Sequence, residues 1–216
     1  MAPPLAQHTH DPRQGISLKL LSVFLFCLMN VQIKLLHGEY PTSQIVFSRS
    51  FFALFPLIPL VMAAGGLMAL KVKSWKGQTI RNFVGLTAMV LTFYALPHIP
   101  LATFTTILFT MPLFVVVLAA LILKEPLSGG RLGAVLVGFA GVMIVLRPTM
   151  HMDFYALMAL TAAFFVAIVT VIIRQLTATE NSIAIVFWFT LFCTIASGLL
   201  MLTGFKMPDL HDALLL

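Results

Sequence analysis

Seven apolar runs, separated by short polar segments, constrain this chain more than any other feature. They cover residues 16–36, 42–64, 80–96, 101–123, 132–146, 154–173 and 183–202. A helix rises about 1.5 Å per residue, so about 20 apolar residues cross the hydrocarbon core of a bilayer. Charged residues make up only 9% of the chain, against about 25% in soluble domains. The sequence predicts an all-α polytopic membrane protein with seven transmembrane helices, of which the third and fifth are short.

The positive charges predict how these helices are oriented. With the N-terminus in the cytoplasm, the cations on the inner side are Arg13, Lys19, Lys71, Lys73, Lys76, Arg81, Lys124, Arg131 and Arg174. The outer side then carries only Arg147 and Lys206. Positive residues concentrate in cytoplasmic loops, so we expect an integral protein of the bacterial plasma (inner) membrane with a cytoplasmic N-terminus. The basic charge therefore indicates contact with a lipid bilayer and not nucleic-acid binding.

The chain also repeats itself at an offset of 140 residues. Between 20–60 and 160–200, the positions that are identical are Leu20, Phe24, Val31, Ile33, Leu36, Ile45, Val46, Phe47, Phe52 and Leu60. Composition alone would give roughly four matches. Five predicted spans separate the two copies, and an odd number turns the second copy upside down. Inverted repeats let many secondary transporters open one central site to either side in turn.

This repeat predicts the organisation of the chain. Residues 1–14 contain three prolines and are typical of a disordered cytoplasmic tail. Residues 15–148 form a complete five-helix repeat, and residues 152–216 form a partial second repeat of two helices. We therefore expect the chain to be truncated within its second repeat, or to have its missing spans supplied by a partner, which includes possible self-association.

Several short motifs resemble a known family in their order and spacing. They are FSRSFFA at 47–53, FYAL at 93–96, IPLA at 99–102, MPLF at 111–114, LKEPLS at 123–128, GFAGV at 138–142 and LRP at 146–148. This pattern resembles the EamA-type transporters of the drug/metabolite transporter superfamily. The resemblance implies ten spans in two inverted five-span repeats, with both termini in the cytoplasm. It also implies transport of metabolites such as amino acids, nucleosides, vitamins or drugs.

Arg49 is the strongest candidate for a binding residue. It lies seven residues into the second predicted span, where an unpaired charge costs at least a few kcal/mol. One interpretation is that Arg49 anchors a carboxylate or phosphate of a substrate. The other is that it snorkels to the outer interface or bonds backbone carbonyls. Lys34 lies near the outer end of the first span, where snorkelling explains it.

Five further residues are candidate substrate contacts. Asn30 could bind substrate or tie two helices together. Thr106 and Thr110 belong to a polar stripe before Pro112, which could line a cavity beside a kink or bond its own helix. Tyr94 could be an interface anchor, and Trp188 lies deep enough in the seventh span to face a cavity.

Three hypotheses for function follow. The first is a secondary transporter of a small polar or anionic metabolite or drug, working by alternating access. The second, a membrane enzyme, would need a motif such as His-Glu-x-x-His or paired intramembrane aspartates, and the chain has neither; we expect no catalysis, cofactor or metal site. The third is a truncated remnant or assembly partner that does not transport. No Asp or Glu lies within a predicted span, so facilitated diffusion or exchange fits as well as proton coupling.

Overall fold

The computed structural model describes residues 12–36, 39–123, 129–146, 154–202 and 204–208. Its elements are α1 (Pro12–Leu35), α2 (Thr42–Ala63), η1 (Gly66–Leu70), α3 (Trp75–Ala95), η2 (Leu96–His98), α4 (Leu101–Leu108), α5 (Met111–Leu123), α6 (Gly129–Leu146), α7 (Phe154–Leu176) and α8 (Ser182–Met201). The chain is an all-α polytopic membrane protein, as the sequence predicts. Most of the predicted tail, residues 1–11, lies outside the described residues.

Six helical segments of the described part are long and apolar enough to cross a membrane. They are Gly15–Leu35, Thr42–Ala63, Trp75–His98, Leu101–Ile122, Phe154–Leu176 and Ser182–Met201. One further helix, α6, has a shorter apolar stretch, Leu132–Ile144. It corresponds to the fifth predicted span, which is also short in the sequence. The third span is longer than predicted because Ser74 caps the helix by accepting a hydrogen bond from the Gly77 amide, which starts α3 five residues before the apolar run.

Local sequence signals set the other helix ends. Pro41 and Pro100 directly precede α2 and α4; proline disfavours a helical residue before it and so marks a boundary. Asn181 caps α8 by accepting from the Ile183 amide at 3.0 Å. The fourth span breaks between Leu108 and Met111, so that it consists of α4 and α5. This break confirms the predicted kink next to Pro112, whose ring cannot continue a regular helix.

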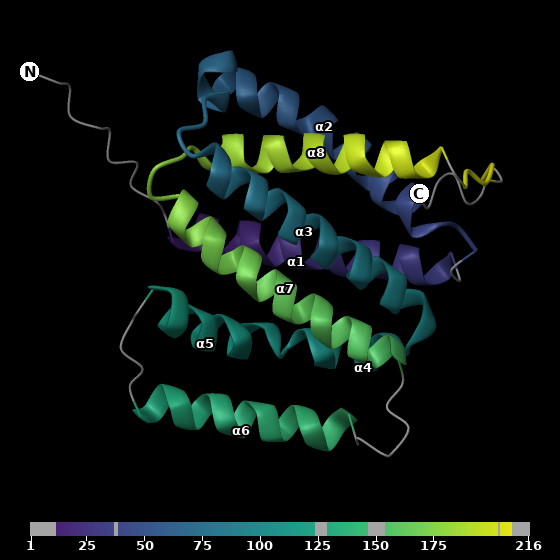
Figure 1. Cartoon of the computed structure of the whole chain (residues 1–216), viewed down its shortest axis with the longest axis vertical. Helices are drawn as coiled ribbons and strands as arrows, with labels where there is room; N and C mark the ends of the chain where they lie inside the picture. The colour runs from purple at the N-terminus through teal and green to yellow at the C-terminus, as the bar shows by residue number, and fades with distance from the viewer. Residues whose placement is uncertain (1–11, 37–38, 124–128, 147–153, 203, 209–216) are drawn as a thin grey trace, which may run out of the picture.

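The helices form a row in which α2, α8, α3, α7 and α5 succeed one another, with α6 at the far end (Figure 1). The two most extensive helix pairs are α3 with α7 and α2 with α8. The second pair is antiparallel. Gln44, near the start of α2, bonds Lys206 after the end of α8, whereas Trp188 near the start of α8 bonds Leu70 after the end of α2. We call the end that holds Gln44 and Lys206 the outer end, following the orientation that the sequence predicts.

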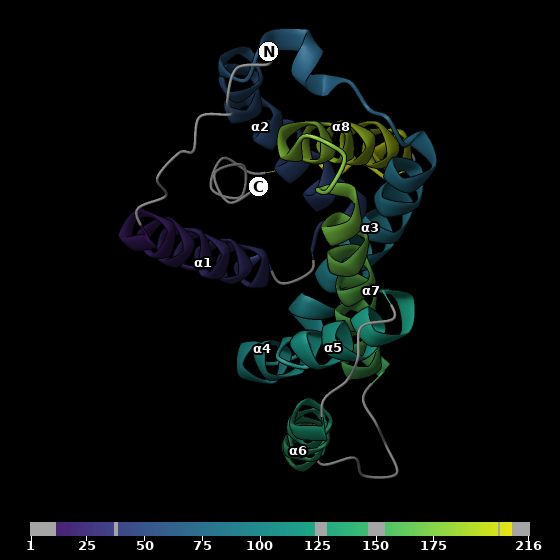
Figure 2. The same cartoon turned by 90° about the vertical axis from the view of Figure 1, so that its left-hand side faces the viewer.

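Helix α1 lies apart from this row (Figure 2). Its large apolar side chains are mostly exposed, with Leu18 and Leu20 both 66% accessible. Only its last turns are buried, where Ile33 and Leu36 join the core formed at the outer end. In a membrane protein such an apolar surface faces lipid or another helix, so the exposure fits a membrane-spanning helix.

Both ends of α3 are held by a charged side chain from another part of the chain. The ammonium of Lys34 donates to the carbonyls of Leu96, Pro97 and Ile99 at 3.4, 2.6 and 2.7 Å. Its charge satisfies carbonyls left open directly after α3, in the turn η2 and at Ile99. Snorkelling of Lys34 to the outer interface stays a prediction. A cation at the C-terminal end of a helix also matches the helix dipole.

The other end of α3 has the opposite charge. The buried carboxylate of Glu180, in the turn between α7 and α8, accepts from the Lys73 amide at 2.9 and 3.0 Å and from the Ser74 amide at 2.7 Å. An anion at a helix N-terminus again matches the dipole. Helix α3 is thus fixed at both membrane boundaries, and it provides the rigid wall on which the candidate site is built.

Candidate functional site

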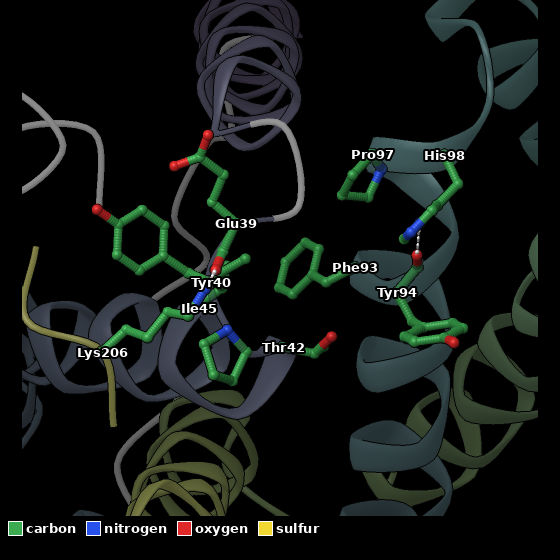
Figure 3. Close-up of a pocket in the computed structure, with 10 residues that line it drawn as sticks. Glu39, Tyr40, Thr42, Ile45, Phe93, Tyr94, Pro97, His98 and Lys206 are labelled. Carbon is green, nitrogen blue, oxygen red and sulfur yellow. Dashed lines mark hydrogen bonds between the residues drawn. The ribbon is translucent and has the colours of Figure 1, made fainter. Parts of the chain in front are cut away.

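A pocket opens at the outer end between the start of α2 and the end of α3 (Figure 3). Its volume is about 320 Å³, and its lining is formed by Glu39, Tyr40, Pro41, Thr42, Ile45, Phe93, Tyr94, Pro97, His98 and Lys206. The Lys206 ammonium donates to the Glu39 carbonyl at 2.9 Å, which leaves the exposed Glu39 carboxylate at the mouth. This volume is at the lower end of the range for small-molecule sites.

One wall of the pocket is aromatic. The ring of His98 stacks on the ring of Tyr155 of α7 with a centroid distance of 4.0 Å. The centroid of the Tyr94 ring lies 5.9 Å from that of Tyr155. The His98 Nδ1 atom lies 2.8 Å from the Tyr94 carbonyl oxygen (Figure 3). The predicted contact Tyr94 therefore lines the pocket, on a surface suited to a flat or apolar part of a ligand.

Arg49 lies next to this pocket. It is one turn of α2 beyond Ile45, and its guanidinium is 5.4 Å from the centroid of the Phe93 ring; Ile45 and Phe93 both line the pocket. Its Nη1 also approaches the sulfur of Met89 at 3.4 Å. Among the described residues, its guanidinium contacts a ring face and a thioether, and no salt bridge to a carboxylate is found there. Phe93, which is 2% exposed, separates the guanidinium from the open pocket.

The structure places the other predicted contacts away from this pocket. Asn30 is buried on α1, and its side-chain oxygen has no hydrogen-bond partner in the described part of the chain. Thr106 donates to the Ala102 carbonyl and Thr110 to the Ile107 carbonyl, at 2.8 and 2.7 Å. Trp188 lies near the opposite end of α3.

Trp188 and Trp75 form an aromatic pair at the inner end, 5.1 Å apart and edge to face. The indole N–H of Trp188 donates to the Leu70 carbonyl at 2.9 Å. Together the two rings line a second pocket of about 230 Å³ with Thr79 and Asn82 of α3 and residues of α8. The predicted cavity residue therefore lines a cavity, but a different one from that beside Tyr94.

Sequence reasoning missed one buried cation, Arg81. We counted it among the cytoplasmic cations because the apolar run begins only at residue 80. In the structure α3 begins at Trp75, so Arg81 lies six residues inside the helix and is 6% exposed. Its guanidinium lies 3.7 Å from the centroid of the Phe189 ring of α8. The signal that could have found it is Ser74, a favoured helix-capping residue.

Gly85 makes that contact possible. A Cβ atom at this position would lie 2.7 Å from Cε2 of Phe189. Gly85→Ala should therefore push the ring away and lower the stability of the protein by about 1–2 kcal/mol, the usual cost of overpacking. Thermal unfolding in detergent measures this effect. Gly141→Ala on α6, where a Cβ meets nothing within 4 Å, is the matched control, and equal effects of the two substitutions would contradict the assignment.

The comparisons with known proteins fit this arrangement. The model of the EamA-like transporter family matches residues 13–147. The chain belongs to that family. It is 32% identical over 198 residues to a pseudopaline exporter of Pseudomonas aeruginosa, an alignment that covers 91% of this chain and 69% of the exporter.

Two further relatives transport other molecules. A riboflavin transporter of Vibrio cholerae is 26% identical over 204 residues, which cover 93% of this chain and 68% of the relative. An S-adenosylmethionine uptake transporter of Rickettsia prowazekii is 28% identical over 184 residues, or 85% of this chain and 62% of the relative. No solved structure matches this chain significantly. The relatives of this EamA-family chain are thus transporters, and their cargoes differ.

Proposed function

We propose that this EamA-family protein is a secondary transporter of a small anionic metabolite, and that Arg49 holds the anionic group. The observation that carries this proposal is a guanidinium within the membrane-spanning helix α2, next to a pocket, that has no salt bridge to a carboxylate among the described residues. A charge at that depth is costly, and such residues usually serve a substrate path. A carboxylate or phosphate would supply the bidentate partner that the guanidinium lacks.

The pocket and Arg49 suggest an order of events. An anion enters at the outer end, where the Tyr94 and His98 rings receive its apolar part. Phe93 then swings aside and exposes Arg49. Because α2 and α8 are the repeat mates and pack along each other, we infer that they exchange roles when the site opens to the other side. We also propose that the chain contains inverted repeats and that its N-terminus faces the cytoplasm at the inner membrane. Self-association of the chain is part of the same proposal.

The test is flux into proteoliposomes that contain the full-length protein. We expect saturable uptake of at least one anion among succinate, glutamate and glycerol 3-phosphate, with neutral riboflavin, neutral glycerol and the net cation S-adenosylmethionine as comparisons. Arg49→Gln should lower that flux at least about tenfold, because a charge-assisted hydrogen bond contributes about 1.5–3 kcal/mol. Arg49→Lys should retain part of the flux, since the charge remains but the planar fork does not.

A matched control removes a cation elsewhere. Lys76 is exposed at the start of α3, and Lys76→Gln should leave the flux unchanged. Undiminished anion uptake by Arg49→Gln, or uptake of the neutral compounds alone, would overturn the proposal.

A further inference from the structure

Arg81 is a buried cation that lacks hydrogen-bond partners in the described part of the molecule. It is 6% exposed within a membrane span, and neither its Nε nor its Nη1 atom has a hydrogen-bond partner among the described residues. Buried polar groups are nearly always hydrogen-bonded, and a buried unpaired charge is strongly unfavourable. A guanidinium whose Nε and Nη1 atoms lack partners among the described residues is therefore suited to bind an oxyanion.

The surroundings of Arg81 offer it no anion. Phe189 covers one face of the guanidinium. The neighbouring amide of Gln78 donates to Asn82 and to the Ile185 carbonyl, both at 3.2 Å, so it is occupied on its donor side. Glu180, which lies near the start of α3, is already bonded to the Lys73 and Ser74 amides. Nothing described in the structure neutralises Arg81.

Arg81 and Arg49 belong to one continuous feature. Arg81, Gly85, Met89 and Phe93 recur every four residues and so share one face of α3. Arg49 contacts the outer half of this face, at Met89 and Phe93. Residue 189, the repeat mate of residue 49, contacts the inner half at Arg81. Each half of the face thus holds one arginine against one phenylalanine. In the outer half α3 supplies the phenylalanine, and in the inner half it supplies the arginine.

Cys193 lies near the inner half of this face. It is fully buried on α8, one turn beyond Phe189, whose ring covers the Arg81 guanidinium. The α2–α3–α8 junction therefore contains two cations at different depths and a buried thiol on α8. The Cα atoms of Arg81 and Met89 are eight residues apart, or about 12 Å along the helix.

We propose that Arg81 is a second oxyanion site, which receives the carboxylate or phosphate of the transported molecule on its way between Arg49 and the inner side. This proposal rests on the proposed function, because it assigns the inner half of the same path. It assigns to Arg81 a contact with substrate, whereas a purely structural Arg81 would only pack on Phe189. The two roles differ in the electrostatic potential that an entering ion meets.

Cys193 reports that potential directly. In a Cys27→Ser background of the full-length protein in membrane vesicles, we would measure the rates at which two methanethiosulfonates modify Cys193. One reagent carries a sulfonate and the other a trimethylammonium group; in both cases the thiolate displaces methanesulfinate and forms a mixed disulfide. The arginines change the thiolate fraction equally for both reagents, so the ratio of the two rates isolates the charge along the path.

The expected result is a ratio that favours the sulfonate reagent and falls at least about tenfold in Arg81→Gln, since the two reagents differ by two unit charges. Arg81→Lys should restore most of the ratio, and Lys76→Gln should leave it unchanged. Succinate or glycerol 3-phosphate should slow the sulfonate reagent in the parent and not in Arg81→Gln.

Three outcomes would overturn the proposal: no modification of Cys193 by either reagent, a ratio that favours the cation, or a ratio that Arg81→Gln does not change. The measurement needs no transport, so it separates the two proposals. If Arg49→Gln abolishes anion flux while Arg81→Gln leaves the ratio intact, Arg81 is structural and the proposed function stands. If the ratio depends on Arg81 but Arg49 does not affect flux, the proposed function fails and the anion site stands.

Discussion

Lys34→Met should lower the free energy of unfolding by about 3 kcal/mol. The ammonium donates to three carbonyls where α3 ends, two of them at 2.6 and 2.7 Å, and each hydrogen bond to a charged group contributes about 1.5–3 kcal/mol. Methionine fills a similar volume but leaves these carbonyls without a donor. Unfolding in detergent, followed by circular dichroism, measures the loss.

The control for this prediction lies on the same helix. Lys19 of α1 is exposed, and Lys19→Met removes the same charge without a described hydrogen bond from its side chain. We expect an effect within about 0.5 kcal/mol, which is usual for surface substitutions. Equal stability of the two variants would show that Lys34 does not hold the end of α3.

Glu180→Ala should destabilise the protein by a similar amount, about 3 kcal/mol. The substitution removes the acceptor of the Lys73 and Ser74 amides and the anion that matches the α3 dipole. Glu180→Gln should cost less, because its amide oxygen still accepts one of the bonds. Hydrogen exchange of the Lys73 and Ser74 amides should accelerate in both variants.

Glu39→Ala is the matched control for Glu180. The Glu39 carboxylate is exposed at the pocket mouth, and we expect its loss to leave unfolding unchanged. If Glu180→Ala unfolds like the parent protein, or if exchange of the two amides does not change, the carboxylate contributes nothing to the start of α3.

The spans could be predicted from the sequence because hydropathy is a property of contiguous residues. The kink before Pro112 and the short apolar stretch of α6 could be predicted for the same reason, because both depend on residues that are close together in the sequence. The roles of Lys34 and Glu180 could not be predicted, because their partners lie 62 to 107 residues away. The position of Lys34 near the end of a predicted span indicated an interface role, but this position does not reveal which carbonyls are open.

The candidate site was predictable only in part. Arg49 stands out in sequence because a charge interrupts an apolar run. Arg81 does not, since it lies at the edge of such a run and its burial depends on where α3 begins. Thr106 and Thr110 share a helix face by spacing, but spacing does not show that their hydroxyls bond their own backbone. Side-chain partners across helices require the packing of α2, α3 and α8.

The two charged residues that hold the ends of α3 are synthesised at different times, Lys34 before this helix and Glu180 after it. Lys34 is synthesised before α3, so the last turn of this helix meets its partner as soon as it emerges from the ribosome. Glu180 follows Ser74 by 106 residues, and the first turn must wait until α7 has been made. We therefore expect the first turn of α3 to lack its carboxylate partner until residue 180 has been synthesised.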